Sequence, residues 1–550
     1  MSRFLSMLLD SAARTDHGMT TGEPNAPVRR TWAQVHETAL GMAAALRAGT
    51  DVLPGLEPGS SVGVLAGEPA TIAPAAQAVW LTGGSVTMLH QPTPRTDLAA
   101  WAEDTVSVLK MIDARLVLLG PPFDALAPVL TERGIAFRTL DSLVADDGAI
   151  VADAGVADDG DTALLQLTSG STAEPKAVRI THGNLHANIT AMREAAELDV
   201  ERDVMVSWLP LFHDMGMVGF LTVPMVTGLE LVTVTPVDFL RKPLLWAELI
   251  SKYGGTVTAA PNFAYAVLAR QLARAEGPLD LSTMRIALNG AEPIDAAAVG
   301  SFVTAGARFG LPPESVLCAY GMAETALGVA FAPAFTGLAV DEIDAEQLEK
   351  HRRAVPGSGR QFPKLGPPLP GIEIRVVGGD GAVRGEREVG ILQLRGPSVT
   401  PEYLTVHGPV ATQDAEGWLD TGDEGYLVEG QVVVCGRRKD VIIMGGRNIY
   451  PTDIERAAVE ADDVRAGNAV AVRLAAGDGR RRETFAVVVE SRKAGDAEAE
   501  DVIRKDVTRR VLTAVGVRPD EVVVLGPGTL PKTPSGKLRR AATGELVAKA

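Results

Sequence analysis

Cysteine is nearly missing from this sequence: Cys318 and Cys435 are the only two among 550 residues. Two cysteines are too few to crosslink a chain of this length, and they do not show the spacing of metal ligands, which argues against a disulfide scaffold and a cysteine-bound metal. A reducing compartment is therefore expected. The first thirty residues lack the long apolar segment of a secretory signal, so we expect a cytoplasmic location.

An excess of positive charge and long uninterrupted apolar runs are also missing. The chain has 52 basic and 69 acidic residues, a formal net charge of −17, which argues against binding to the phosphate backbone of nucleic acid. The most apolar long window, residues 216–234, contains Pro224 and Glu230. We interpret it as a buried helix and strand and expect no membrane span.

The sequence is long and is rich in turn residues. A chain of 550 residues exceeds one hydrophobic core, and its 57 glycines and 35 prolines suit a turn-rich α/β enzyme better than a helical bundle. Up to about residue 318, helical patterns alternate with β-rich runs, which predicts βαβ units and two doubly wound subdomains. The expected elements include a helix over 32–46 and strands over 61–65, 85–88, 116–119, 204–207, 229–234, 255–259 and 284–288.

The pattern changes twice in the second half of the chain. From Pro370, short strands and Gly-rich turns indicate a β-rich subdomain, and near Gly436 a compact mix of helices and strands begins. We therefore predict an α/β fold with α+β elements. It comprises an N-terminal domain over 1–436, a hinge over 437–440 and a small C-terminal domain over 441–550.

The first candidate for chemistry is LQLTSGSTAEPKAV, residues 165–178. Small hydroxyl residues on a turn that contains glycine can direct O–H and N–H groups at phosphate oxygens, and Lys176 adds positive charge. The GxxxxGK[ST] pattern of a Walker A loop is not present. Taken alone, this composition is more typical of an ordinary surface loop.

Three more segments place polar residues next to apolar runs. In SWLPLFHDMGMVG (207–219), His213 and Asp214 are surrounded by apolar residues, where a polar pair is costly unless it is satisfied or used. NGAEP (289–293) and AYGMAET (319–325) follow apolar runs, and ligands bind beyond the carboxyl ends of parallel strands. A hydrogen-bonded core histidine and exposed loop glutamates are the ordinary alternatives.

Two charged segments complete the set. Residues 420–454 carry Asp423, Arg437, Lys439 and Asp440 around β-rich runs, and PKTPSGKLRR (531–540) holds Lys537 on a loop. Taken alone, the first is typical of a charged hairpin and the second of a basic tail.

In their order and spacing, these segments together resemble the adenylate-forming superfamily of acyl-CoA ligases, acyl-AMP ligases, luciferases and peptide-synthetase adenylation domains. The resemblance covers about residues 30–545. Within it, SWLPLFHDMGMVG, APNFAYAVLAR (260–270), NGAEP and GRNIYPTDIE (446–455) look most like fatty acyl-AMP ligases. An extra stretch over 331–365 also resembles the insertion of that branch.

The resemblance implies ATP, Mg²⁺ and a role for each matched residue. Tyr320 would stack on adenine, and Asp423 would bind the ribose hydroxyls with Arg437 nearby. Glu324 and Thr168 would hold Mg²⁺, and Lys537 would meet the substrate carboxylate and the α-phosphate as a catalytic residue, together with Glu324 and His213. The other nucleotide contacts would come from Thr168, Ser169, Gly170, Ser171, Thr172, Lys176, Gly290, Ala291, Glu292, Gly321 and Met322.

The implied reaction has two steps that share one site. A lipophilic carboxylic acid, fatty or polycyclic, becomes acyl-AMP with release of pyrophosphate. The C-terminal domain then swings about Lys439, and a phosphopantetheine thiol of an acyl carrier protein or of CoA takes the acyl group. The insertion favours the carrier protein, but a loosely packed insertion would still permit CoA. The acyl pocket would be lined by Trp208, His213, Phe263, Ala291 and Met322, each of which could equally be plain core.

Two departures from the family pattern predict weak adenylation. Ala173 stands where the family usually has glycine, at a cost of roughly 1 kcal/mol if that position needs φ > 0, and Glu174 adds negative charge near the expected triphosphate. An acyl-CoA ligase that works mainly in the thioesterification half-reaction is therefore an alternative. A nucleotide-binding protein without chemistry is disfavoured by the presence of Lys537, Glu324 and Asp423 together. A nicotinamide oxidoreductase is disfavoured because no GxGxxG follows a strand. The sequence leaves the oligomeric state open.

Overall fold

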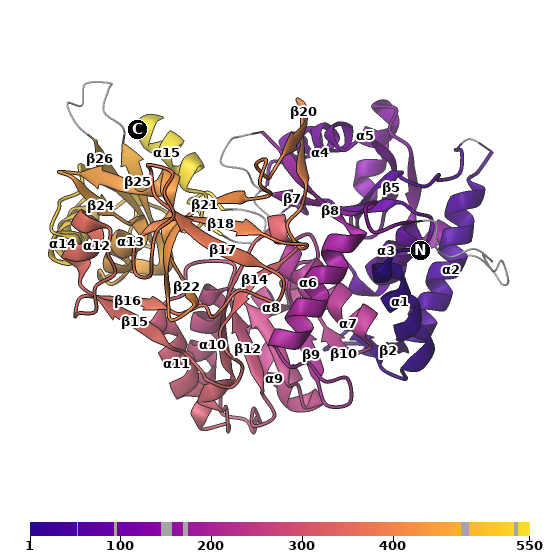
Figure 1. Cartoon of the computed structure of the whole chain (residues 1–550), viewed down its shortest axis with the longest axis horizontal. Helices are drawn as coiled ribbons and strands as arrows, with labels where there is room; N and C mark the ends of the chain where they lie inside the picture. Colours follow the sequence, from indigo (N-terminus) through magenta and orange to yellow (C-terminus); the bar gives the residue numbers. More distant parts are fainter. Residues whose placement is uncertain are drawn as a thin grey trace. The chain divides into compact units, whose positions relative to one another are not determined.

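The computed structural model describes residues 1–51, 53–92, 96–144, 157–168, 174–474, 483–532 and 537–549. The chain divides into two compact units, each built from separate stretches of sequence (Figure 1). The first unit comprises Met1–Leu338, Leu365–Glu373 and Arg395–Leu419. The second comprises Ala339–Lys364, Ile374–Leu394 and Asp420–Ala550. The α/β fold class expected from the sequence is confirmed.

The first unit contains an eight-stranded sheet in the order β14-β13-β12-β11-β9-β10-β1-β2. Its strands from β13 to β1 are parallel, and antiparallel strands close both edges. This arrangement agrees with the predicted alternation of strands and helices, because a parallel pair needs a crossover connection. The strands are β1 (Gly18–Thr21), β2 (Val28–Thr31), β9 (Val204–Ser207), β10 (Glu230–Thr233), β11 (Val257–Ala260), β12 (Ile286–Asn289), β13 (Val316–Gly321) and β14 (Gly328–Phe331).

A second eight-stranded sheet in the same unit has the order β20-β19-β8-β7-β4-β3-β5-β6. The strands from β7 to β6 are parallel, whereas β8, β19 and β20 extend the sheet as antiparallel strands. Strand β19 therefore lies beside β8 although it comes from a distant part of the sequence. The strands are β3 (Ser61–Leu65), β4 (Ser85–Met88), β5 (Ala114–Leu119), β6 (Phe137–Thr139), β7 (Thr162–Thr168), β8 (Lys176–Thr181), β19 (Glu402–Thr405) and β20 (Gly408–Ala411).

Helices connect these strands. The predicted helix over 32–46 is α2, which begins after a capping box formed by Thr31 and Gln34 and ends before Gly49 at φ 67°. The helices of this unit are α1 (Arg3–Arg14), α2 (Trp32–Ala48), α3 (Pro69–Leu81), α4 (Leu98–Met111), α5 (Ala127–Glu132), α6 (His182–Ala195), α7 (Val223–Thr227), α8 (Pro236–Arg241), α9 (Leu245–Tyr253), α10 (Asn262–Arg274) and α11 (Ala296–Ala307).

The apolar window 216–234 is mostly buried, as the sequence predicted. It forms a π-helix, η3 (Met215–Thr222), followed by α7 and β10, and every residue of η3 is buried. Among the described residues, no helix combines the length and the apolar character that a membrane crossing requires.

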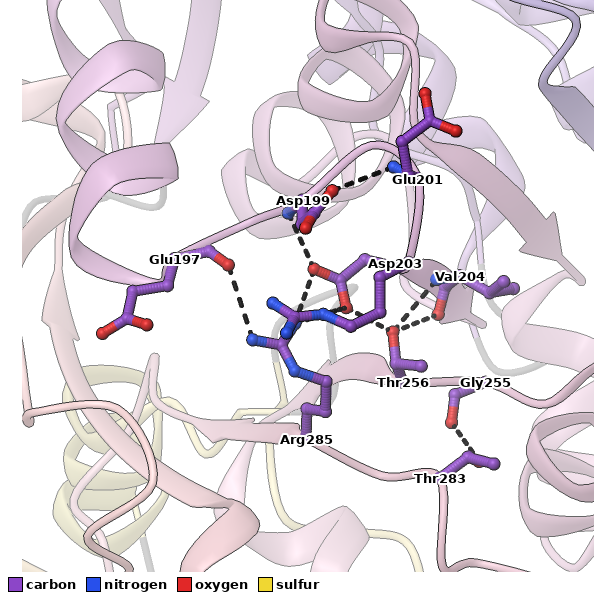
Figure 2. A network of polar contacts seen from close by, with 10 residues as sticks. Glu197, Asp199, Glu201, Asp203, Val204, Gly255, Thr256, Thr283 and Arg285 are labelled. Carbon is purple, nitrogen blue, oxygen red and sulfur yellow. Dashed lines mark hydrogen bonds and ion pairs between the residues drawn. The ribbon is translucent and has the colours of Figure 1, made fainter.

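A buried ion pair holds the amino ends of three parallel strands together (Figure 2). Asp203, directly before β9, is fully buried, and both of its carboxylate oxygens contact Nη1 of Arg285, at 2.5 and 2.6 Å. Thr256, directly before β11, donates its hydroxyl to the same carboxylate at 2.8 Å, and Arg285 directly precedes β12. A buried charge needs such partners, so this cluster fixes the three strands relative to one another. Their carboxyl ends are thereby positioned as well.

The second unit combines a β-rich part with a smaller α+β part. One sheet has the order β17-β18-β21-β22, and a three-stranded sheet has the order β25-β26-β27. Buried residues of α13 and α14 share one apolar core with β25 and β26. The strands are β15 (Val340–Ile343), β16 (Arg360–Pro363), β17 (Glu373–Val377), β18 (Gly390–Arg395), β21 (Leu419–Val428), β22 (Gln431–Arg437), β23 (Ile442–Met444), β24 (Arg447–Ile449), β25 (Val464–Leu474), β26 (Thr484–Ser491) and β27 (Glu521–Leu525). The helices are α12 (Ala345–His351), α13 (Pro451–Val459), α14 (Ala497–Val515) and α15 (Arg540–Lys549).

The predicted domain boundaries and the hinge over 437–440 stay predictions, because packing alone does not show which segments move.

Candidate active site

Four of the segments singled out in the sequence follow four neighbouring parallel strands. Trp208 follows β9, Phe263 lies just beyond β11, Gly290 follows β12, and Tyr320 lies at the end of β13. Because these strands are parallel and adjacent in the sheet, their carboxyl ends share one edge. This is the edge where open α/β sheets bind ligands.

Aromatic side chains gather at this edge. The Trp208 ring is 4% exposed and stacks on Phe239, with centroids 3.8 Å apart. Phe263 lies 6.5 Å from Trp208, centroid to centroid, in an edge-to-face arrangement. Two of the residues predicted to line an acyl pocket are therefore brought together in an apolar cluster.

The loop after β12 is constrained by its backbone. Ala291 adopts φ 68°, a left-handed conformation that is costly for a residue with a Cβ and that tends to occur at functional sites. Glu292 accepts a hydrogen bond from the backbone N–H of Phe263 at 2.7 Å, which satisfies a free donor at the start of α10. Glu292 therefore joins two of the ligand-edge loops.

The segment after β13 approaches its neighbour closely. A Cβ at Gly321 would lie 2.4 Å from the carbonyl oxygen of Leu327, so only glycine fits there without rearrangement. Tyr320 and Met322 lie on either side of this glycine, and the Tyr320 hydroxyl is 3.9 Å from the Met322 sulfur. The three residues predicted to contact the nucleotide here form one compact turn.

His213 and Asp214 form a close pair at the start of the π-helix. Nδ1 of His213 lies 2.5 Å from Oδ1 of Asp214, and both side chains are mostly buried. Asp214 also accepts from the backbone N–H of Met215 at 2.7 Å. Nearby, burial and then the charge of His213 lower the pKa of His90 to about 4, so His90 is neutral at physiological pH. The predicted polar pair is therefore satisfied locally, at a helix type that often marks functional sites.

The predicted phosphate loop connects two antiparallel strands. Thr168 ends β7 and Lys176 begins β8, and the two are register partners. The loop residues Ser169, Gly170, Ser171, Thr172 and Ala173 lie outside the described residues. Gln166, in β7, donates to the carbonyl oxygen of Phe212 at 3.0 Å. This bond ties the end of β7 to the His213 segment.

Glu174 comes directly after the residues outside the description and is 61% exposed at its side chain. Its Oε2 is 3.4 Å from Nε2 of His407, which is itself 78% exposed, in the turn between β19 and β20. The charge of Glu174 is therefore largely screened by solvent.

Lys176, Glu324 and Tyr403 form a contact cluster that the sequence did not reveal as a whole. Nζ of Lys176 lies 3.7 Å from Oε1 of Glu324 and 3.8 Å from the centroid of the Tyr403 ring. The Tyr403 hydroxyl donates to the same Oε1 of Glu324 at 2.7 Å. Tyr403 belongs to β19 and lies outside the motifs singled out in the sequence. Only the pairing of β19 with β8 places it here, and no local sequence signal could have found it.

The residues predicted to hold Mg²⁺ have suitable chemistry. Glu324 supplies a carboxylate that is 12% exposed at its side chain. The hydroxyl oxygen of Thr168 is buried and has no hydrogen-bond partner among the described residues. No group of three or more His, Cys, Asp or Glu in the described ranges could form a metal cage. This donor set fits Mg²⁺, which commonly binds one or two protein oxygens together with nucleotide phosphates.

In the second unit, the two residues predicted near the ribose are paired. Asp423 and Arg437 are register partners in β21 and β22, with Nε 3.1 Å from Oδ1. Asp423 is 5% exposed, whereas the side chain of Arg437 is 56% exposed.

The predicted hinge is joined to the start of α15, three residues after Lys537. Lys439 lies in the short turn η6 (Arg438–Asp440). Arg540, three residues after Lys537, makes ion pairs with Asp440 at 2.8 Å and with Glu455 at 2.6 Å. The positions of Lys537 and of Asp423 relative to the residues of the first unit stay predictions.

The stretch over 331–365, which resembles an insertion, belongs mainly to the second unit and is firmly packed there. Glu349 of α12 is 3% exposed and pairs with Arg447 at 2.6 Å and with Arg360 of β16 at 3.4 Å. Arg360 also pairs with Asp453, at the start of α13. Both Arg447 and Asp453 follow the predicted hinge. Buried ion pairs thus join the insertion-like stretch to the segment after the hinge.

The comparisons with known proteins agree with this geometry. The family model described as AMP-binding enzyme matches residues 11–404. The protein Rv1013 of Mycobacterium tuberculosis, named only as a ligase, is 56% identical over 553 residues and covers 100% of both chains. The medium-chain-fatty-acid–[acyl-carrier-protein] ligase JamA of Moorena producens is 33% identical over 403 residues, covering 69% of this chain and 67% of its own length.

A solved structure, from a study of fatty acyl-adenylate ligases of E. coli and L. pneumophila, superposes with a TM-score of 0.88. It is 29% identical and covers 100% of this chain and 98% of that chain. The resemblance predicted from the sequence is therefore confirmed. The chain belongs to the AMP-binding enzyme family and is an adenylate-forming acid–thiol ligase.

Proposed function

We propose that this protein converts a lipophilic carboxylic acid and ATP into acyl-AMP and pyrophosphate, and then transfers the acyl group to the phosphopantetheine thiol of an acyl carrier protein. The observation that carries the proposal is the cluster of Lys176 and Glu324 beside the ligand edge of the sheet. Two anions must meet in the first step, so positive charge is needed there. Lys176 would supply it directly, and Glu324 would supply it by holding Mg²⁺.

The electrostatics of the first step explain these residue types. A carboxylate that attacks the α-phosphate of ATP is repelled until positive charge neutralises its path. Lys176 would neutralise charge on the β- and γ-phosphates, and Lys537 would do so at the attacking carboxylate and the α-phosphate. A Mg²⁺ held by Glu324 and Thr168 would supply further positive charge as pyrophosphate leaves.

The aromatic cluster supports a lipophilic acid. Trp208, Phe239 and Phe263 form an apolar wall, and Met322 and Ala291 lie on the loops of the same sheet edge. Such a lining suits a fatty or polycyclic acyl group better than a charged one.

The packing of the insertion-like stretch favours a carrier protein over CoA. A swing about Lys439 would have to break the buried pairs that Glu349 and Arg360 make with Arg447 and Asp453, and breaking a buried pair is expensive. A loosely packed stretch would permit CoA as acceptor, and these buried pairs argue against loose packing. The name of JamA, a relative that uses acyl carrier protein, points in the same direction.

The decisive experiment measures pyrophosphate release with fatty acids of graded chain length, and analyses the products with CoA and with a phosphopantetheinylated carrier protein. We expect acid-dependent release, and a thioester on the carrier protein in preference to CoA. Lys537→Ala should lower pyrophosphate release by about 10²- to 10³-fold. Unchanged ATP-driven activity in this variant would refute the role of Lys537.

A matched pair of variants tests the acceptor. Arg360→Met removes the charge that joins the insertion-like stretch to Asp453 and should raise CoA thioester formation relative to carrier thioester. Arg387→Met is the control, because Arg387 joins Asp341 of β15 to the β-rich part at 3.0 Å and not to the segment after the hinge. Equal acceptor ratios in both variants would contradict the restraint.

Strong turnover with CoA but not with the carrier protein would favour an acyl-CoA ligase. Slow ATP-driven turnover beside fast thioester formation from supplied acyl-AMP would favour the version with weak adenylation. The exposed position of Glu174 argues against that residue as the cause of such weakness.

A further inference from the structure

The carboxylate of Glu324 is held asymmetrically. The Tyr403 hydroxyl and the Lys176 ammonium both contact Oε1, at 2.7 and 3.7 Å. The backbone N–H of Thr400, in the chain leading into β19, also donates to the carbonyl oxygen of Glu324 at 2.9 Å. Strand β19 and the residues that lead into it therefore fix both the backbone and one carboxylate oxygen of this glutamate.

Tyr403 contacts Lys176 through a different part of its side chain. The ammonium lies 3.8 Å from the ring centroid, within the range of a cation–π interaction. The side chain of Lys176 is 29% exposed, so solvent weakens its attraction to the Glu324 carboxylate. The ring can therefore hold the ammonium without a tight ion pair. One tyrosine thus holds an anion with its hydroxyl and a cation with its ring.

We propose that Tyr403 is a positioning residue for the adenylation step. Its hydroxyl occupies Oε1 of Glu324 and leaves Oε2 for a divalent cation, while its ring holds the Lys176 ammonium at the start of β8 and keeps it available to ATP. This inference rests on the proposed function and concerns the same site.

The physical reason is competition between two cations for one carboxylate. Without the hydroxyl, the carboxylate can rotate and close on Lys176, because an ammonium and a carboxylate attract strongly in a partly buried site. The pair would then have to open before a metal ion binds. A hydrogen bond to a charged group is among the stronger ones in proteins, so the phenol is well suited to prevent that closure.

The test is a binding measurement, which does not require the acid substrate to be known. Calorimetry with the non-hydrolysable analogue α,β-methylene-ATP at graded Mg²⁺ concentrations gives the Mg²⁺ concentration for half-maximal binding. In Tyr403→Phe, which keeps the ring, we expect this concentration to rise about tenfold, with little change in affinity at saturating Mg²⁺. In Tyr403→Leu, which also loses the ring, affinity at saturating Mg²⁺ should fall by a further factor of about five.

Tyr426→Phe is the matched control. The Tyr426 hydroxyl also donates to a carboxylate, Oδ2 of Asp341, at 2.7 Å, but within the second unit. This variant should leave the Mg²⁺ dependence unchanged, so it separates a role in positioning from the general loss of a tyrosine hydroxyl.

An unaltered Mg²⁺ dependence in Tyr403→Phe would overturn the inference, even if the melting temperature fell, because stability alone is what a purely structural tyrosine contributes. Failure of the unmodified protein to bind the analogue at any Mg²⁺ concentration would be a different result. It would overturn the proposed function together with this inference.

Discussion

Two glutamates of this protein contact basic side chains in opposite ways. Glu324 has a lysine at 3.7 Å that is 29% exposed, and within the described part of the chain both of its side-chain contacts are to Oε1. Glu349 is 3% exposed and is clamped between Arg360 and Arg447. The first arrangement leaves ligand positions free, and the second uses them up. The contacts of Glu324 therefore leave room for a ligand to bind, whereas the contacts of Glu349 hold two parts of the structure together.

The largest effect that we expect is a loss of stability in the variant Glu349→Gln. Removing this charge leaves two arginines short of a partner in a buried site, which should cost about 3–5 kcal/mol. Chemical denaturation measures the free energy of unfolding of the protein. A loss below about 1 kcal/mol, the usual range of surface pairs, would show that the ion pairs of Glu349 do not stabilise the fold as buried pairs do.

The same change at the other glutamate should act on catalysis. In Glu324→Gln, acid-dependent pyrophosphate release should fall by about 10²- to 10³-fold, because a ligand for the cation is lost. The free energy of unfolding should change little, since Lys176 can return to solvent. An activity close to that of the parent protein, measured at saturating Mg²⁺ and ATP, would remove Glu324 from the site.

A buried histidine, whose charged form is opposed by burial more than it is favoured by Asp161 and Asp159, sharpens the comparison in a third way. His182 is fully buried and its Nδ1 is 3.0 Å from the Ser2 hydroxyl. Burial lowers its pKa from 6.5 to about 4. Between these two values the unfolded chain binds more protons than the folded chain, so stability falls as the pH drops from about 6.5 to about 4, by up to about 3 kcal/mol.

This pH dependence is checked with His182→Gln, which cannot ionise. Its free energy of unfolding should change less over that pH window than the free energy of the parent protein. Equal slopes for the two proteins would mean that His182 does not supply the acid sensitivity.

The smallest effect is expected at Glu174. Its pair with His407 is exposed on both sides, and exposed pairs contribute about 0–1 kcal/mol. Glu174→Gln should therefore change the KM for ATP by less than about threefold, and raised salt should reduce even that. A much larger gain in ATP affinity would show that this charge does repel the nucleotide.

Much of the first unit follows from local sequence patterns. Ser61–Leu65, Ser85–Met88 and Val204–Ser207 are strands with the bounds that were expected, because short apolar runs between turn residues determine them locally. The strands expected over 229–234 and 255–259 differ by one or two residues at their ends, where fraying makes boundaries least defined.

The contacts that complete the site depend on distant pairing and could not be predicted. Tyr403 contacts Glu324 because β19 lies beside β8. No pattern within residues 395–411 predicts that pairing. Arg360 and Glu349 are likewise ordinary surface residue types in composition, and only tertiary packing buries them. The family resemblance supplied Lys176 and Glu324 as separate positions, and the fold supplied the tyrosine between them.

The central claim is that this chain activates acids as adenylates. Mass spectrometry of a reaction with ATP, Mg²⁺ and a fatty acid, in the absence of any thiol, tests it most directly. We predict acyl-AMP together with one equivalent of pyrophosphate, and loss of the acyl-AMP when phosphopantetheinylated carrier protein is added. ATP that binds but yields neither product with any fatty acid would contradict the account.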